Sequence, residues 1–202
     1  WAQAEEAYRK AIALRPDWVV PYRNLGGLFL ATDKPQEAVA VYDGGLAAIP
    51  DNAELLMARA AAQERSKDYE GAIRSYEAVL AKNPNVVLAV NNLAALIADV
   101  RPTDNDALQR AIRLAEPLRS SENPFFLDTL GWLYYRTGDL TQARLLLQDA
   151  VKRRGDIPQL QYHLAAVLYQ TGDLAGARAA LAKALVAGAD YPGIDHARSL
   201  MA

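Results

Sequence analysis

The sequence contains no cysteine, little histidine and no long apolar run. The absence of cysteine among its 202 residues excludes disulfides, thiolate metal ligands and a cysteine nucleophile, although it does not fix the redox compartment. The longest uncharged stretch, residues 83–98, is too short to span a bilayer and contains four asparagines. The 22 basic and 24 acidic residues nearly balance, so the composition provides no basic surface for nucleic acid or anionic lipid.

The sequence begins at Trp1, without an initiator methionine or a signal-like apolar region. We therefore expect it to be a piece of a longer protein, from which any targeting segment has been removed.

What the sequence does have is a repeated pattern. Residues 127–143 (LDTLGWLYYRTGDLTQA) and 161–177 (QYHLAAVLYQTGDLAGA) lie 34 residues apart and end almost identically. Each copy belongs to a pair of amphipathic helical patterns separated by a turn. Gly138 and Gly172 stand where a left-handed residue can end a helix, and the aspartate after each can cap the next helix. The pattern predicts stacked helix pairs.

The period extends over most of the chain. Starts at residues 19, 53, 87, 124 and 158 give steps of 34 residues, with one step of 37. Small residues recur at one position of each helix, which lets paired helices approach closely, and no pair can bury its apolar face alone. The small residues are Gly26, Ala60, Ala94, Gly131 and Ala165 in the first helices, and Ala38, Ala72, Ala143 and Ala177 in the second. We expect a single array over residues 1–202: a half repeat at 1–18, repeats at 19–52, 53–86, 87–123, 124–157 and 158–191, and a capping helix at 192–202.

The third repeat departs from the pattern because it contains three extra residues and Pro102. We expect a longer polar loop at residues 99–106. Two interpretations remain open at this stage, a tolerated surface insertion and a protruding contact element.

These residues carry a resemblance to a known family. The spacing of Leu130, Gly131 and Tyr134, followed by Ala143, resembles the tetratricopeptide repeat (TPR) signature. The resemblance implies an all-α, right-handed superhelix of about five repeats with a leading half repeat. It also implies a non-catalytic scaffold that binds other proteins without a cofactor or metal. The C-terminal part looks like bacterial envelope TPR proteins associated with exosortase (PEP-CTERM) and exopolysaccharide systems. That likeness implies a larger bacterial protein in the periplasm or envelope, with the cytoplasm left open.

In the family, the first helices line a concave groove that holds a peptide or helix of a partner. Asparagine amides can bond an extended peptide there, and aromatic rings can anchor its apolar side chains. For the asparagines, hydrogen bonding along the helix surface remains an alternative. For Trp132 and Tyr135, packing between repeats is an equal alternative. The residues expected in the groove are Arg23, Asn24, Asn91, Asn92, Asp128, Trp132, Tyr135, Tyr162, His163 and Tyr169.

Rival functions receive less support. His163 near Asp128 and Tyr162 is a minor catalytic hypothesis, but recognised catalytic and metal-binding motifs are lacking. The charges expected in the groove cancel, which disfavours RNA binding. The chaperone-docking clamp of the family is not supported, since Leu88 stands where a lysine is needed. A spacer role remains open. So does self-association through Trp1, Tyr8 and Ile12.

Overall fold

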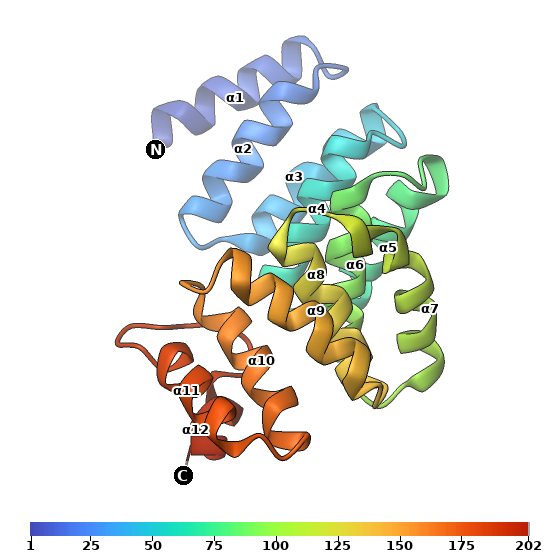
Figure 1. Ribbon diagram of the computed structural model, residues 1–202. Helices are drawn as coiled ribbons and strands as arrows, with labels where there is room; N and C mark the ends of the chain where they lie inside the picture. Colours follow the sequence, from blue (N-terminus) through green and yellow to red (C-terminus); the bar gives the residue numbers. More distant parts are fainter. Residues whose placement is uncertain (202) are drawn as a thin grey trace. The chain divides into compact units, whose positions relative to one another are not determined.

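The computed structural model describes residues 1–201, which form helices joined by short turns and contain no strand (Figure 1). The helices are α1 (Ala2–Leu14), α2 (Val19–Ala31), α3 (Pro35–Ala48), α4 (Ala53–Arg65), α5 (Tyr69–Lys82), α6 (Val87–Val100), α7 (Asn105–Ala115), η1 (Glu116–Ser120), α8 (Pro124–Arg136), α9 (Leu140–Arg153), α10 (Pro158–Gln170), α11 (Leu174–Ala184) and α12 (Ile194–Met201).

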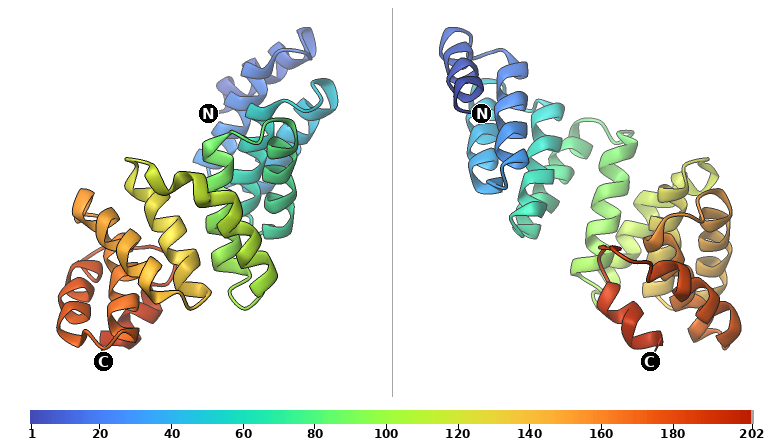
Figure 2. Two further views of the ribbon diagram at one scale, coloured as in Figure 1. Left: turned by 45° about the vertical axis from the view of Figure 1, so that its right-hand side comes forward. Right: turned by 90° about the vertical axis from the view of Figure 1, so that its left-hand side faces the viewer.

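Helix pairs are the building block of the fold. Helices α2, α4, α6, α8 and α10 begin at the residues where the sequence pattern places the repeat starts. Helix α2 packs on α3 and α4 on α5, while α8 packs on α9 and α10 on α11 (Figure 2). Successive first helices also touch, α2 with α4 and α8 with α10. The predicted all-α architecture of paired helices is confirmed.

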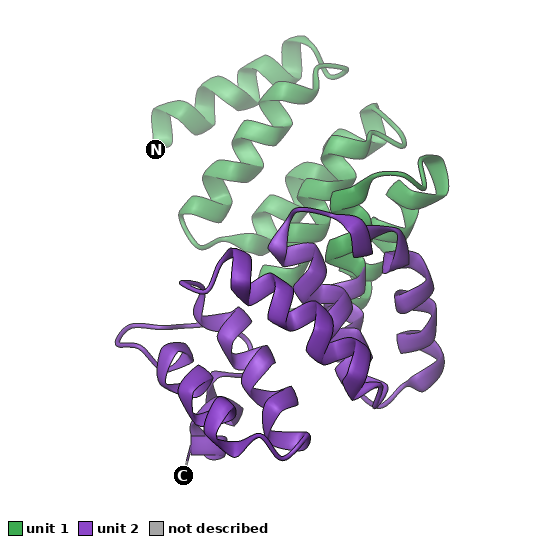
Figure 3. Ribbon diagram, viewed as in Figure 1, with its two compact units in different colours: residues 1–93 green, residues 94–202 purple. Residues whose placement is uncertain are grey.

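The chain divides into two compact units, residues 1–93 and 94–202 (Figure 3). Unit 1 has a core built around Tyr22, Leu25, Phe29 and Tyr42. Unit 2 contains a second core of buried residues, Ala143, Leu147, Leu164, Val167, Leu168 and Ala177. A single array over residues 1–202 therefore stays a prediction.

The turn between the two helices of a repeat has one recurring geometry. Asp33, Lys67, Gly138 and Gly172 occupy the same place in four repeats, and all four adopt a left-handed φ between 56° and 85°. The aspartate that follows Gly138 and Gly172 accepts a hydrogen bond from a backbone N–H of the first helical turn, as predicted. This turn reverses the chain direction, so that the second helix packs against the first.

The third repeat differs in its turn. The distance from Val87 to Asn105, the starts of α6 and α7, is 18 residues, against 16 from Val19 to Pro35 in the first repeat. Helix α6 continues to Val100, so the irregular segment is 101–104 rather than the expected 99–106. Most of the insertion is thus a longer turn between two regular helices.

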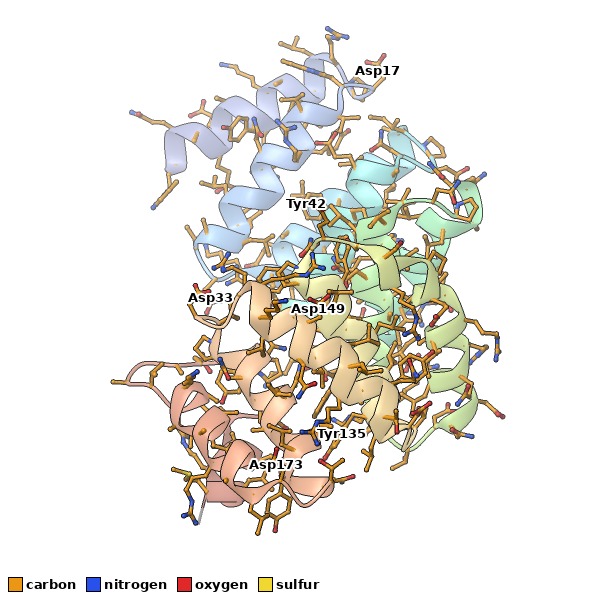
Figure 4. The ribbon with its side chains drawn as sticks, viewed as in Figure 1. Asp17, Asp33, Tyr42, Tyr135, Asp149 and Asp173 are labelled. Atoms are coloured by element: carbon orange, nitrogen blue, oxygen red, sulfur yellow. The ribbon has the colours of Figure 1, made fainter. Side chains whose placement is uncertain are left out.

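The small residues of the pattern are where helices touch most closely. A β-carbon added to Gly26 would lie 2.2 Å from Cζ of Tyr42, whose ring is buried (labelled in Figure 4). Gly131 contacts Leu147 in the same way in the fourth repeat, and the matching alanines, Ala60, Ala94 and Ala165, are fully buried. The paired small and large residues therefore fix the distance between the helices of a repeat.

Candidate protein-binding surfaces

A surface depression in unit 1 lies where the sequence places the start of the groove. It encloses about 400 Å³ and is lined by α1 and α2. We call it the first-repeat depression; its lining residues are Trp1, Ala4, Tyr8, Arg23, Asn24, Gly27, Leu28 and Ala31. A β-carbon added to Gly27 would meet no atom within 4 Å, so the floor of the depression is open. Two of the predicted groove residues, Arg23 and Asn24, lie in its wall.

The guanidinium of this wall already has partners. Nη1 of Arg23 donates to Oε1 of Glu54 at 2.9 Å, and both side chains are about half exposed. Nε of Arg23 donates to Oδ1 of Asn24 at 3.3 Å, so the two wall residues hold each other. Exposed ion pairs contribute little free energy. A ligand can therefore displace Glu54 from Arg23 at a small cost in free energy.

Asn91 and Asn92 of α6 lie apart from that depression. Nδ2 of Asn92 donates to the phenol oxygen of Tyr76 at 3.3 Å, and Nδ2 of Asn91 donates to Oδ1 of Asn92 at the same distance. The phenol of Tyr76 in turn donates to Glu64. Asn91 therefore makes the local bond that the sequence left as an alternative, whereas Asn92 bonds across to α5. Oδ1 of Asn91 is buried without a hydrogen bond among residues 1–201.

Most of the other predicted residues meet in one cluster of unit 2. The Trp132 ring stacks on Tyr135 at 4.6 Å and on His163 at 4.0 Å between ring centroids. Tyr162 lies 5.6 Å from Trp132 and 5.3 Å from His163. We call these four residues, from α8 and α10, the aromatic cluster. Trp132, Tyr162 and His163 are each less than 5% exposed, so they pack between repeats, and Tyr135 remains half-buried (labelled in Figure 4).

A buried polar pair supports this cluster. Nδ1 of His163 lies 2.9 Å from both carboxylate oxygens of Asp128, and both residues are buried. The pair fixes the imidazole plane, against which Trp132 stacks. His163, Asp128 and Tyr162 thus meet, as the minor catalytic hypothesis required. Their burial and mutual packing favour a structural role, because catalysis needs access for a substrate.

The C-terminal helix covers Tyr162. The phenol of Tyr162 lies 3.0 Å from Nδ1 of His196 on α12, and Tyr191 packs on the same ring at 5.7 Å. Gly193, with φ of 91°, brings its backbone so close that a β-carbon would lie 2.5 Å from the Tyr162 ring. Burial raises the pKa of Tyr162 to about 12. The sequence predicts the capping helix, but it does not show that the helix would cover a predicted groove residue.

Two charged residues join the edge of the cluster although they were not among the predicted site residues. The guanidinium of Arg136 lies 4.8 Å from the Trp132 ring centroid. Asp99 of α6 is exposed, yet the protein around its carboxylate removes enough water to raise its pKa, while His163 and Arg136 act in the opposite direction. Both residues occupy the same position of the first helix in successive repeats. This shared position is the feature of the sequence that could have indicated that they lie near each other.

Tyr169 is the remaining predicted residue. It lies near the end of α10, is 48% exposed, and stays outside the aromatic cluster. Beside it, Nε2 of Gln170 donates to the phenol oxygen of Tyr135 at 3.2 Å. Among residues 1–201, no group of three or more histidine or carboxylate side chains is placed to hold a metal. Nor is any helix of that range long and apolar enough to cross a membrane. Partner binding at the ten predicted residues remains a prediction.

Comparison with known proteins identifies related chains. The family profile described as Tetratricopeptide repeat matches residues 23–87 and 129–192. A TPR repeat-containing protein of Pseudomonas aeruginosa, PA4667, is 29% identical over 155 residues, which cover 76% of this chain and 26% of the relative. The chain therefore spans about a quarter of that relative's length.

Solved structures share the fold. TTC0263, a TPR protein of Thermus thermophilus, superposes with a TM-score of 0.70 at 21% identity, covering 89% of this chain and 97% of that one. YrrB, described as a TPR protein with an unusual peptide-binding site, superposes with a TM-score of 0.65 at 19% identity, covering 96% and 99%. At these identities the likeness is one of fold alone.

Proposed function

Because this chain belongs to the tetratricopeptide repeat family, whose members generally act as protein-interaction scaffolds, we propose that it is a non-catalytic module that binds a segment of a partner protein along its first helices. The observation that carries this proposal is the first-repeat depression, where Gly27 leaves space beside the exposed Arg23 and the half-buried Asn24. A small residue at this position lets a partner backbone approach, and the asparagine amide can bond it.

The setting of this interaction is a further part of the proposal. The C-terminal resemblance to bacterial envelope TPR proteins, and the bacterial origin of PA4667, support a place within a larger bacterial protein or envelope assembly. The partner would be a protein, held as a peptide or helix, rather than nucleic acid.

A selection from a displayed library of random peptides tests the proposal. Peptides that the chain enriches would be measured by calorimetry against the wild type, Gly27→Leu and the matched control Gly27→Ala. The leucine would project into the depression, since nothing lies within 4 Å of a β-carbon at this residue. We expect Gly27→Leu to weaken binding about tenfold or more, as a contact at the centre of an interface does, and Gly27→Ala to leave it nearly unchanged.

Two results would count against the proposal. A chain that enriches no peptide would act as a spacer. Peptides that bind Gly27→Leu and Tyr135→Ala as tightly as the wild type would be held on another face. Tyr162 is unsuitable as a test residue because its replacement would disturb the packing of α12.

Self-association is a second candidate, favoured by α1. This helix contains no buried residue, and Trp1 is 79% exposed. If α1 mediates contact between copies, sedimentation of the wild type will depend on concentration, and Trp1→Ser combined with Ile12→Ser will abolish that dependence. A single monomeric species at all concentrations would exclude it.

A further inference from the structure

The first repeat has a second depression, on the opposite face of α2 from the first-repeat depression. It encloses about 310 Å³ between α1 and α3, with α2 beneath, and we call it the α1–α3 cleft. Its floor includes the buried Leu25 and Phe29 of α2, and its walls include Ile12 of α1 and Val41 of α3. A space of this size with an apolar lining can hold one large apolar side chain.

In the second repeat, polar side chains of the chain itself bridge the matching space. Arg59 of α4 donates to Asp43 of α3 at 2.9 Å and to the hydroxyl of Ser75 on α5 at 3.1 Å. That hydroxyl in turn donates to Oε1 of Gln63 at 2.6 Å. The first repeat cannot form this bridge, because it has apolar residues at the same positions. The residues that lie 34 positions before Arg59, Gln63 and Ser75 are Leu25, Phe29 and Val41.

The fourth repeat also bridges its matching space. The guanidinium of Arg119 on η1 lies 5.4 Å from the centroid of the Tyr134 ring and donates to Gln142 of α9 at 2.9 Å. Tyr134 and Gln142 occupy the repeat positions of Phe29 and Glu37. In this repeat, a cationic side chain thus covers the ring and bonds to the residue on the second helix.

The first repeat has the ring and a carboxylate at these two positions, but no side chain joins them. The guanidinium of Arg9 lies 5.9 Å from the Phe29 ring centroid and donates to Glu5 of its own helix at 2.9 Å. Glu37 is exposed and makes no ion pair among residues 1–201. The rim of the cleft therefore presents one carboxylate that can pair with a cation from outside the chain.

We propose that the α1–α3 cleft binds a partner polypeptide through one large apolar side chain and a cationic residue next to it. The apolar side chain packs on Leu25 and Phe29, and the cationic residue pairs with Glu37. Charge complementarity selects the cation, since Arg9 is already paired with Glu5. This surface is formed by two second helices and lies apart from the first-repeat depression, so the inference does not depend on binding there.

Titration with short peptides tests the cleft. The chain is labelled with ¹³C at the δ1-methyl groups of its isoleucines, and the signal lost in Ile12→Val is the reporter for the cleft. The probe is N-acetyl-phenylalanyl-lysine amide. N-acetyl-alanyl-lysine amide lacks the apolar anchor, and N-acetyl-phenylalanyl-glutamate amide reverses the charge.

We expect the Ile12 signal to shift saturably with the probe, while the signal of Ile73, which is buried in α5, stays in place. Loss of the aromatic ring should weaken binding about tenfold or more, because burial of the ring provides most of the free energy. Replacement of lysine by glutamate should weaken binding about threefold, as expected for an exposed ion pair.

Variants of the chain separate the cleft from the first-repeat depression. A β-carbon at Gly44 would lie 4.0 Å from the Tyr22 ring, which is an ordinary contact, so a leucine there projects into the cleft. We expect Gly44→Leu to weaken binding of the probe about tenfold or more, and Gly44→Ala to leave it nearly unchanged. Gly27→Leu, in the first-repeat depression, should have no effect. Glu37→Gln should abolish the preference for lysine over glutamate. Circular dichroism checks that each variant folds.

Four results would overturn the inference: no saturable shift of the Ile12 signal, equal affinity for the alanine peptide, full binding by Gly44→Leu, or a preference for lysine that is absent from the wild type or survives in Glu37→Gln. A shift of the Ile12 signal with protein concentration alone would assign the cleft to a second copy of the chain, and would also overturn it.

Discussion

At the scale of the residue, the turn within each repeat depends on one left-handed position. Gly138 and Gly172 satisfy it without strain, whereas Lys67, with φ of 63°, carries a β-carbon in a conformation that is unfavourable for L-residues. Lys67 is exposed and its backbone N–H is bonded to the oxygen of Glu64. The second repeat therefore keeps the turn geometry although a lysine is less favourable than a glycine at the left-handed position.

We predict that Lys67→Gly raises the free energy of unfolding of unit 1 by about 1 kcal/mol, because the steric cost of the left-handed conformation is removed. Lys67→Ala keeps the β-carbon and serves as the control, with no gain expected. Urea unfolding followed by circular dichroism measures both. A gain of equal size in the two variants would point to the lysine charge instead.

Two adjacent glycines of α2 should respond in opposite ways to the same change. A β-carbon at Gly26 would lie 2.2 Å from the buried Tyr42 ring, so Gly26→Ala should destabilise the chain by about 1–3 kcal/mol. Gly27 faces open space, so Gly27→Ala should stabilise the helix by up to about 1 kcal/mol. Thermal unfolding of the two variants tests the pair. Equal effects would show that Tyr42 can move aside.

At the scale of the element, η1 is tied to the fourth repeat by a network of side chains. Glu116 accepts hydrogen bonds from Arg119 and from the phenol of Tyr134, and Arg119 also donates to Gln142 at 2.9 Å. The hydrogen bond from Arg119 is the main cause that holds the pKa of Glu116 below its ordinary value of 4.5.

Because the pKa of Glu116 is lower in the folded chain than in the unfolded chain, its contribution to stability is complete above pH 4.5 and is lost as the pH falls further. The ion pair is more than a third exposed, so we expect Glu116→Gln to cost at most about 1 kcal/mol at pH 7. The difference from the wild type should shrink as the pH falls below 4.5 and through the lowered pKa of Glu116 in the folded chain. Urea midpoints over this range, with Glu77→Gln on the exposed face of α5 as the control, provide the measurement.

The helices could be predicted from the sequence, but the packing of the candidate site could not. Helix starts follow from local chemistry, because the turn glycines, capping aspartates and Pro35 act within one helical turn. The burial of Trp132, Tyr162 and His163 depends on contacts between residues about 30 apart, including those made by α12. The register does place Asp99 and Arg136 at one position of successive first helices, but it does not show the desolvation that raises the pKa of Asp99.

At the scale of the whole molecule, stability in a repeat chain is set repeat by repeat, because each helix pair depends on its neighbours. Helix α1 is the extreme case in unit 1: it contacts α2 but contains no buried residue, whereas α2, α4 and α5 each contain at least five. The free energy needed to open α1 locally should therefore be much smaller than the free energy of unfolding of the whole chain.

We predict that the backbone amides of α1 exchange with deuterium at least about tenfold faster than those of α4 and α5, since opening free energies rise with buried contacts. Mass spectrometry of peptic fragments from unit 1 measures this order. Protection of α1 equal to that of α4 would mean that another surface covers it in solution, which self-association would explain. A concentration series of the same experiment separates these cases.

The stacking of Trp132 on His163 has an optical consequence. A protonated imidazole in van der Waals contact with an indole quenches its emission by accepting an electron from the excited ring, whereas neutral imidazole does so far less. Trp1 and Trp18 are exposed and can be replaced by phenylalanine, which leaves Trp132 as the only tryptophan to excite selectively. The brightness of that single ring will then report the charge of the imidazole beneath it.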